Sequence, residues 1–327
     1  MFPGAPFAVA VPTPKNDYNL LIFNVLLLLQ TAHWTIRNDV AFPTIPAPMS
    51  DTPQPSPSLP RAARLPINRC NLPAAILGGL TFQRHPTVLE IDGVREMHRP
   101  FFARLDGIDA PEARAEAFMD YMTVSFRLES LEDAGLTPGQ RKGRAKANYL
   151  RLLRGWSFDS NGQEGAVLKG WVESRFGLLP RFHGGVLINP QGDLGGNGYK
   201  KYLHDRSAGL YGTNALEAQL DLVHRFCQYE LARRFPAQTH LRLYRGANRL
   251  DDHEIIEKIG GNRRIVLLNN LNSFTDNRER ADEFGDFILQ AETPLAKVFF
   301  FNRLLPGMLK GEDEFVVLGG LYEVAVV

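Results

Sequence analysis

Three groups of residues in the last third of the chain have types and spacing that could carry out chemistry. Arg245 lies at the end of a predicted strand, Ser273 stands at the start of a second one, and Glu312 and Glu314 are two residues apart before a third. Alternate residues of a strand point to the same side, so both glutamates would face one cleft. Two adjacent carboxylates are costly unless a cation lies near them. A substrate on which positive charge develops would supply that cation.

The elements that must position these residues are short strands, which follow a helical first half in the sequence. Alternation and apolar runs predict strands at 240–245, 264–268, 287–290, 297–301, 314–318 and 322–327, with a helix at 278–284. Caps and apolar residues spaced by three and four predict earlier helices at 109–135, 137–155, 164–176 and from about 213. The predicted fold class is therefore α+β. We divide it into a helical region, 65–212, expected to recognise partners, and a mostly β catalytic core, 213–327.

The N-terminal segment, residues 1–64, differs in composition from the rest. The first 60 residues hold 11 of the 22 prolines and five charged residues. Met49 is followed by a polar stretch rich in proline and serine, which is typical of a disordered N-terminus. We expect residues 1–48 to be an upstream over-extension of the reading frame, with translation beginning at Met49.

The overall composition excludes several classes of protein. Lys and Arg total 37 against 36 Asp and Glu, a net charge of +1, which gives no basic excess for nucleic acid or an anionic membrane. The apolar run 20–29 is ten residues long, and a bilayer span takes about 20. Cys70 and Cys227 are too few for a disulfide framework or a four-cysteine zinc site. A cytoplasmic protein is expected.

Two further motifs fail the test for a cofactor or metal site. The glycine-rich stretch Gly192–Gly198 lacks the Rossmann spacing because residue 201 is lysine, and the chain has no Gly-Lys pair for a Walker loop. We interpret it as a surface or substrate-facing loop. The segment His253–Glu257 begins like a zinc-protease motif but has Glu where the second His belongs. It is expected to be a charged helical surface, and no metal is predicted.

The order Arg245, Ser273, Glu312-x-Glu314 resembles the arginine-specific mono-ADP-ribosyltransferases. Their signature is an Arg on the first core strand, a Ser at a strand start, and Glu-x-Glu on a later strand. From about residue 68 onward the chain looks more closely like the bacterial NAD-dependent dinitrogenase-reductase ADP-ribosyltransferases. The segments that carry this resemblance are 89–95, 98–102 and 182–185.

The resemblance implies a role for each candidate residue. Glu314 would be the catalytic carboxylate that hydrogen-bonds the ribose of NAD, with Ser273 bracing it and Thr275 a weaker candidate on the same strand face. Arg245 would bind the NAD phosphates, because its planar donors suit them. Glu312 would orient the incoming arginine, whose guanidinium is otherwise a poor nucleophile.

The resemblance also implies partners. The protein substrate would be dinitrogenase reductase, inactivated reversibly by the modification, and a P-II-type nitrogen signalling protein would regulate the enzyme. The segment 303–311, with its Pro306-Gly307 turn, would meet the protein substrate.

Other functions remain open on the sequence. Taken singly, Arg245 could pair with a carboxylate, Ser273 could be a turn or cap, and both glutamates could be solvated charges on an edge strand. The same residues would also serve an NAD glycohydrolase, or a transferase with another protein target, and product analysis separates these. A non-catalytic nucleotide- or protein-binding module is the alternative of a different class, and it predicts that Glu314→Gln leaves function intact.

Overall fold

The computed structural model describes residues 57–128, 148–189, 191–211, 213, 215–249, 253–307 and 313–327. All of these belong to one unit, Pro55–Val327. The predictions for the N-terminal 56 residues, for the helix start at 137 and for Glu312 lie outside the described residues. The division of the folded part at residue 212 stays a prediction.

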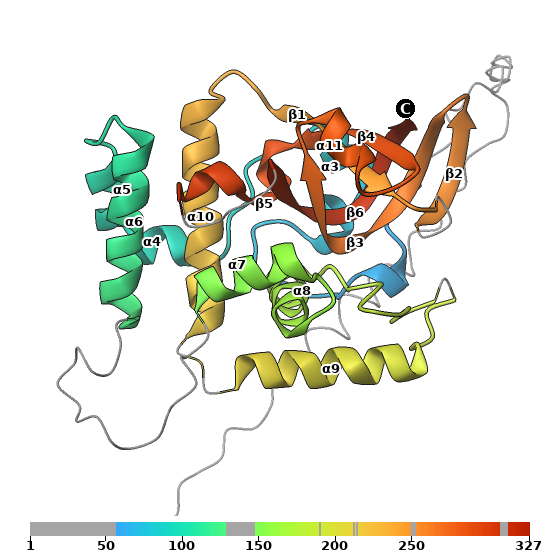
Figure 1. Ribbon diagram of the computed structural model, residues 1–327, viewed down its shortest axis with the longest axis horizontal. Coiled ribbons are helices and arrows are strands. Elements are labelled where there is room, and N and C mark those ends of the chain that lie inside the picture. Colours follow the sequence, from blue (N-terminus) through green and yellow to red (C-terminus); the bar gives the residue numbers. More distant parts are fainter. Residues whose placement is uncertain are drawn as a thin grey trace, which may run out of the picture. The chain divides into compact units, whose positions relative to one another are not determined.

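The first half of the described chain is helical and the second half forms a sheet, so the α+β prediction is confirmed (Figure 1). The longer helices are α6 (Pro111–Phe126), α7 (Tyr149–Phe158), α8 (Gln163–Phe176), α9 (Gly196–Leu210) and α10 (Leu216–Arg234). The short helices are η1 (Arg61–Ala63), α2 (Ala74–Leu77), α3 (Leu80–Arg84), α4 (Val94–Met97), α5 (Arg99–Leu105), α11 (Arg278–Asp282), η3 (Leu295–Lys297) and η4 (Asn302–Leu304).

Backbone geometry at the helix ends corrects two predicted boundaries. Helix α6 ends at Phe126, well before residue 135, because Arg127 adopts a left-handed backbone with φ of 51°. Helix α7 does not run through from residue 137, because Asn148 has an extended backbone and its side chain accepts a hydrogen bond from the Arg151 N–H, an N-cap. Helix α8 ends as predicted, at a left-handed Gly177.

The glycine-rich stretch is not simply a loop, since α9 begins at Gly196. A Cβ on Gly195 or Gly198 would lie 2.0 or 2.7 Å from the Val186 carbonyl oxygen. These glycines therefore allow the start of α9 to approach another backbone segment closely.

Six strands form the sheet, and all of their pairings are antiparallel. They are β1 (His240–Ala247), β2 (Glu254–Gly260), β3 (Arg263–Thr275), β4 (Phe287–Pro294), β5 (Val298–Phe301) and β6 (Glu314–Val326), in the order β2-β3-β1-β4-β6-β5 with an added β3–β6 pairing. Strands β1 and β4 pair along their length, and so do β3 and β6. The two ribbons meet through Tyr244 with Thr275 and through Leu289 with Val326. These contacts lie at opposite ends of the β3–β6 ribbon but at neighbouring positions along β1–β4.

Strand pairing corrects two further predictions. Residues 254–257 belong to strand β2, which pairs with β3, and are not a helix. The segments 314–318 and 322–327 are one strand, β6, because Gly319 and Gly320 let it continue where other residues could not. A Cβ on Gly319 would meet the Asn269 carbonyl oxygen, and Gly320 has φ of +106° beside the Gly78 backbone.

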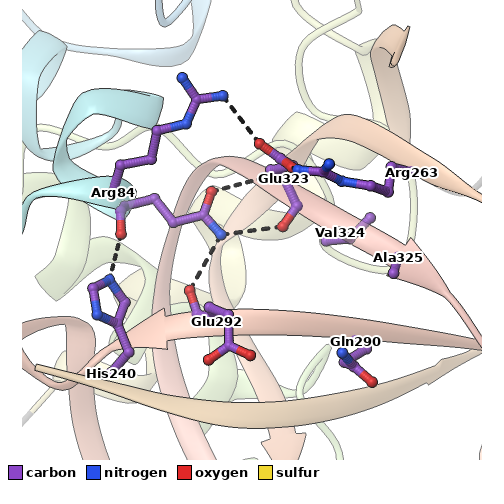
Figure 2. Close-up of a pocket in the computed structure, with 9 residues that line it drawn as sticks. Arg84, His240, Arg263, Gln290, Glu292, Glu323, Val324 and Ala325 are labelled. Carbon is purple, nitrogen blue, oxygen red and sulfur yellow. Dashed lines mark hydrogen bonds and ion pairs between the residues drawn. The ribbon is translucent and has the colours of Figure 1, made fainter. Parts of the chain in front are cut away.

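The helices cover the sheet on two sides. Helix α10 packs on β5, whereas α8 contacts β3 and carries α9 on its outer side (Figure 1). The short helix α3 is joined to the sheet by hydrogen bonds from the Gln83 side chain to the Glu292 and Glu323 carbonyl oxygens. Arg84 pairs with Glu323 at the rim of a cavity there (Figure 2). Among the described residues, no helix combines the length and apolar character needed to cross a membrane.

Candidate active site

Four of the predicted site residues lie around one cavity of about 310 Å³. Arg245 comes from β1, Ser273 and Thr275 from β3, and Glu314 is the first residue of β6. The register explains the convergence, because Thr275 is paired with Tyr244 on one side and with Glu314 on the other. The site therefore lies where the two ribbons of the sheet meet.

Ser273 does not open a strand, which corrects the sequence prediction. Strand β3 begins at Arg263, so Ser273 lies close to its C-terminal end. The Ser273 carbonyl oxygen accepts a 2.8 Å hydrogen bond from Nη1 of Arg245. The β3 backbone at Ser273 thus helps to position the arginine.

The carboxylate of Glu314 is held by two donors from helix α7. Ser157 Oγ donates to Oε2 at 2.7 Å. The indole Nε1–H of Trp156 donates to Oε1 at 3.2 Å and also to Ser273 Oγ at 3.0 Å. Ser273 and Glu314 are therefore linked through Trp156, where the sequence prediction had Ser273 bracing Glu314 directly.

Sequence reasoning missed both donors. Trp156 follows Tyr149, Leu152 and Leu153 on the buried face of an amphipathic helix, so its spacing indicates an ordinary core residue. The only available signal is that a buried indole N–H usually has a hydrogen-bond partner. The exposed Ser157 has no sequence signal at all.

A larger cavity of about 620 Å³ adjoins the first, and the two share Trp156, Ser160, Arg245 and Ser273 as lining residues. Its walls come from both halves of the chain. Lys169 belongs to helix α8, whereas Asn269 and Asn272 belong to strand β3. The helical region thus contributes directly to the candidate site.

The electrostatic character of these walls is cationic. Burial lowers the pKa of Arg245, although the nearby Glu314 carboxylate acts in the opposite direction. Arg245 remains charged at neutral pH, since even a lowered guanidinium pKa is high. Burial, together with Arg245, lowers the pKa of His253 to about 4, so this cavity-lining imidazole is neutral at pH 7. Glu254 is neutralised by an ion pair with Arg181 at 2.6 Å.

The residues present suit a substrate with an anionic centre and a developing positive charge. Arg245 lines both cavities, and its Nε is a buried donor without a partner in the described structure. Glu314 supplies a fixed negative charge in the smaller cavity. An arginine, a serine and a glutamate that converge from adjoining strands are typical of ADP-ribosyltransferases, and this is the class of enzyme that the fold and the site indicate.

Comparisons with known proteins specify the family. The chain matches the model of the dinitrogenase reductase ADP-ribosyltransferase (DRAT) family over residues 67–326. It is 42% identical over 259 residues to the NAD(+)--dinitrogen-reductase ADP-D-ribosyltransferase of Rhodospirillum rubrum, which covers 78% of this chain and 92% of that protein. No solved structure matches it. The chain belongs to the dinitrogenase reductase ADP-ribosyltransferase family.

Proposed function

We propose that this protein transfers ADP-ribose from NAD to an arginine of dinitrogenase reductase and thereby inactivates nitrogenase reversibly. The substrates follow from family membership and from the name of the relative. The observation that carries the chemistry is the position of Glu314, held by two donors in a cavity that also contains Arg245.

NAD supplies the transferred group when its bond from nicotinamide to ribose breaks, and positive charge develops on the ribose as in glycoside hydrolysis. Glu314 is the group that would stabilise this charge. Trp156 donates a hydrogen bond to one carboxylate oxygen and Ser157 donates one to the other. These two bonds fix the orientation of the Glu314 carboxylate before the reaction. A charge that is oriented in advance costs no reorganisation when the bond breaks, which is the source of its catalytic effect.

Arg245 would bind the NAD diphosphate. Its Nη1 donates to the Ser273 carbonyl oxygen, whereas its Nε has no partner within the described structure. One fixed donor keeps the guanidinium plane in place while another remains for the phosphate. Thr275 has a different task in the structure, because its Oγ1 accepts from the Asn277 N–H and so supports the turn into α11.

Glu312 would orient the acceptor arginine, and the segment 303–311 would contact the protein substrate. Arg303, in the described part of that segment, forms an ion pair at 2.9 Å with Asp313, the residue that precedes strand β6.

Regulation by a P-II-type nitrogen signalling protein and a cytoplasmic location complete the proposal. Regulation is supported by the family resemblance. A reducing compartment is supported by the two cysteines, since Cys70 and Cys227 are both free thiols.

Incubation with labelled NAD and purified dinitrogenase reductase, followed by mass spectrometry, tests the proposal. We expect an ADP-ribosyl adduct on arginine that is absent with the Glu314→Gln variant. Free ADP-ribose without an adduct would reject the transfer and indicate an NAD glycohydrolase. Absence of NAD turnover by folded protein would favour a binding module.

A further inference from the structure

Lys169 of helix α8 is a buried cation with no carboxylate in contact. Its side chain is 1% exposed. Nζ contacts the Phe182 carbonyl oxygen at 3.0 Å, Asn161 Oδ1 at 3.3 Å and His183 Nδ1 at 3.3 Å. All three partners are neutral at pH 7, so the charge of a protonated Lys169 is desolvated without an adjacent counter-charge.

Lys169 lines the larger cavity together with Arg245. Within the described structure, neither side chain forms an ion pair, and Nε of Arg245 has no partner. Arg181 lines the same cavity but is neutralised by Glu254. The cavity between helix α3 and the sheet differs in this respect, since Arg84 and Arg263 are both paired with Glu323 there (Figure 2). Among the described residues, the larger cavity therefore has two cationic side chains outside ion pairs, an arrangement that favours the binding of an anion.

We propose that Lys169 is a second cationic contact, beside Arg245, for the diphosphate of NAD, and that Lys169 takes up a proton when NAD binds. This inference rests on the proposed function. On binding, Nζ would exchange its long contact with Asn161, which lines the same cavity, for a phosphate oxygen.

The surroundings of Lys169 make the proton uptake measurable. Burial lowers the pKa of Lys169 to about 7, with Lys201 and Arg245 acting in the same direction and Asp159 in the opposite one. The neighbouring imidazoles do not interfere above pH 7, because burial lowers the pKa of both His183 and His253.

The remaining charged groups nearby are paired. Asp205 accepts from His183 and pairs with Lys201. A phosphate anion would raise the pKa of Lys169, because an opposite charge favours the protonated amine. Between the free and the raised pKa, NAD affinity must therefore fall as pH rises.

Calorimetric titration of NAD at pH 8 tests this, without the protein substrate, in two buffers of different ionisation enthalpy. The full-length protein should take up a large fraction of one proton per NAD. Lys169→Arg should bind NAD with little uptake, because arginine is already charged. Lys169→Met should bind roughly ten- to a hundredfold more weakly, the usual loss for a charged hydrogen bond.

Lys297→Met is the matched control. Lys297 is also buried, its pKa is also lowered to about 7, and its Nζ donates to the Gly319 carbonyl oxygen outside both cavities. This variant should keep the affinity and the proton uptake of the unmodified protein, even if its stability falls.

Unchanged affinity and unchanged proton uptake in Lys169→Met would overturn the inference while leaving the proposed function intact. Failure of the unmodified protein to bind NAD would overturn both. If Lys169→Met does not fold, Asp159→Asn provides the test. Asp159 is exposed, and asparagine can still accept from the Asn161 N–H. Loss of its charge should move the pH at which affinity falls to a lower value, and an unmoved profile would overturn the inference.

Discussion

The Ser157 hydroxyl donates a 2.7 Å hydrogen bond to Oε2 of Glu314, across 157 residues of sequence. The candidate catalytic carboxylate on β6 is therefore oriented by the C-terminal turn of helix α7. A region that the sequence assigns to partner recognition thus also supplies part of the candidate site. Any movement of α7 would alter the orientation of Glu314, which connects the helical half to the chemistry.

Removal of the indole N–H should lower activity without unfolding the protein. Trp156→Phe keeps most of the buried ring but deletes the donor shared by Ser273 and Glu314. We expect kcat to fall roughly ten- to a hundredfold, since a hydrogen bond to a charged group contributes about 1.5–3 kcal/mol. Trp171→Phe is the control, because it deletes a 2.7 Å indole bond to Asp221 outside the cavities. Similar losses of kcat in both variants would contradict the positioning role of Trp156.

The two glutamates should be separable by product. Glu314→Gln should reduce both NAD cleavage and arginine transfer by about two orders of magnitude or more, as for other preorganised electrostatic groups. Glu312→Gln should abolish most arginine transfer while slow NAD hydrolysis continues. Release of nicotinamide and labelling of the target protein would be measured in parallel. Glu292→Gln, which removes the charge paired with the exposed Arg242 outside both cavities, should leave both rates nearly unchanged. Equal loss of both activities in Glu312→Gln would contradict the assigned roles.

The strand patterns, together with the family resemblance, predicted part of the candidate site. Arg245, Ser273 and Glu314 could be identified because each stands beside an apolar strand in a recognisable order, and the structure brings these three together. The donors on α7 could not be predicted in this way. Trp156 and Ser157 reach Ser273 and Glu314 across 117 and 157 residues, and only tertiary packing determines such contacts.

The same physical reason explains the missed elements of the fold. Strand β2 begins with four residues whose pattern suits a helix or a strand, and pairing with β3 decides between them. Helix α9 has a glycine-rich start, which lowers intrinsic helix propensity. Packing against α8, with Tyr202 buried at 1% exposure, outweighs that propensity.

A buried ion pair should contribute strongly to the stability of the helical half. Arg114 of α6 donates to both carboxylate oxygens of Glu230 on α10, at 2.5 and 3.0 Å, and the two side chains are 4% and 0% exposed. Arg114→Met leaves the buried carboxylate with Arg234 alone. We expect a loss of about 3–5 kcal/mol in the free energy of unfolding, measured by urea denaturation. Arg95→Met, which breaks an exposed pair with Glu90, should cost only a small fraction of this. Equal losses would show that burial does not determine the effect.

His224 of helix α10 should make the protein less stable in acid. The imidazole is 2% exposed, lies against Trp171 and Phe176, and has a pKa lowered from 6.5 to about 3 by burial, with Arg225 acting in the same direction. Between these two values the unfolded chain binds a proton that the folded protein excludes. The contribution of the neutral His224 imidazole to the free energy of unfolding is therefore fully present above pH 6.5. It decreases as the pH falls toward 3, by about 1.4 kcal/mol per pH unit for one proton.

The contribution of His224 can be isolated with a variant that cannot titrate. His224→Phe should lose about 2 kcal/mol less stability than the unmodified protein between pH 7.5 and pH 5, because one and a half pH units lie below 6.5. Urea denaturation at the two pH values measures the difference, and carboxylate titrations cancel because both proteins share them. If His224→Phe loses as much stability in acid as the unmodified protein, the imidazole already accepts a proton in the folded state, and α10 would have to admit water beside Trp171.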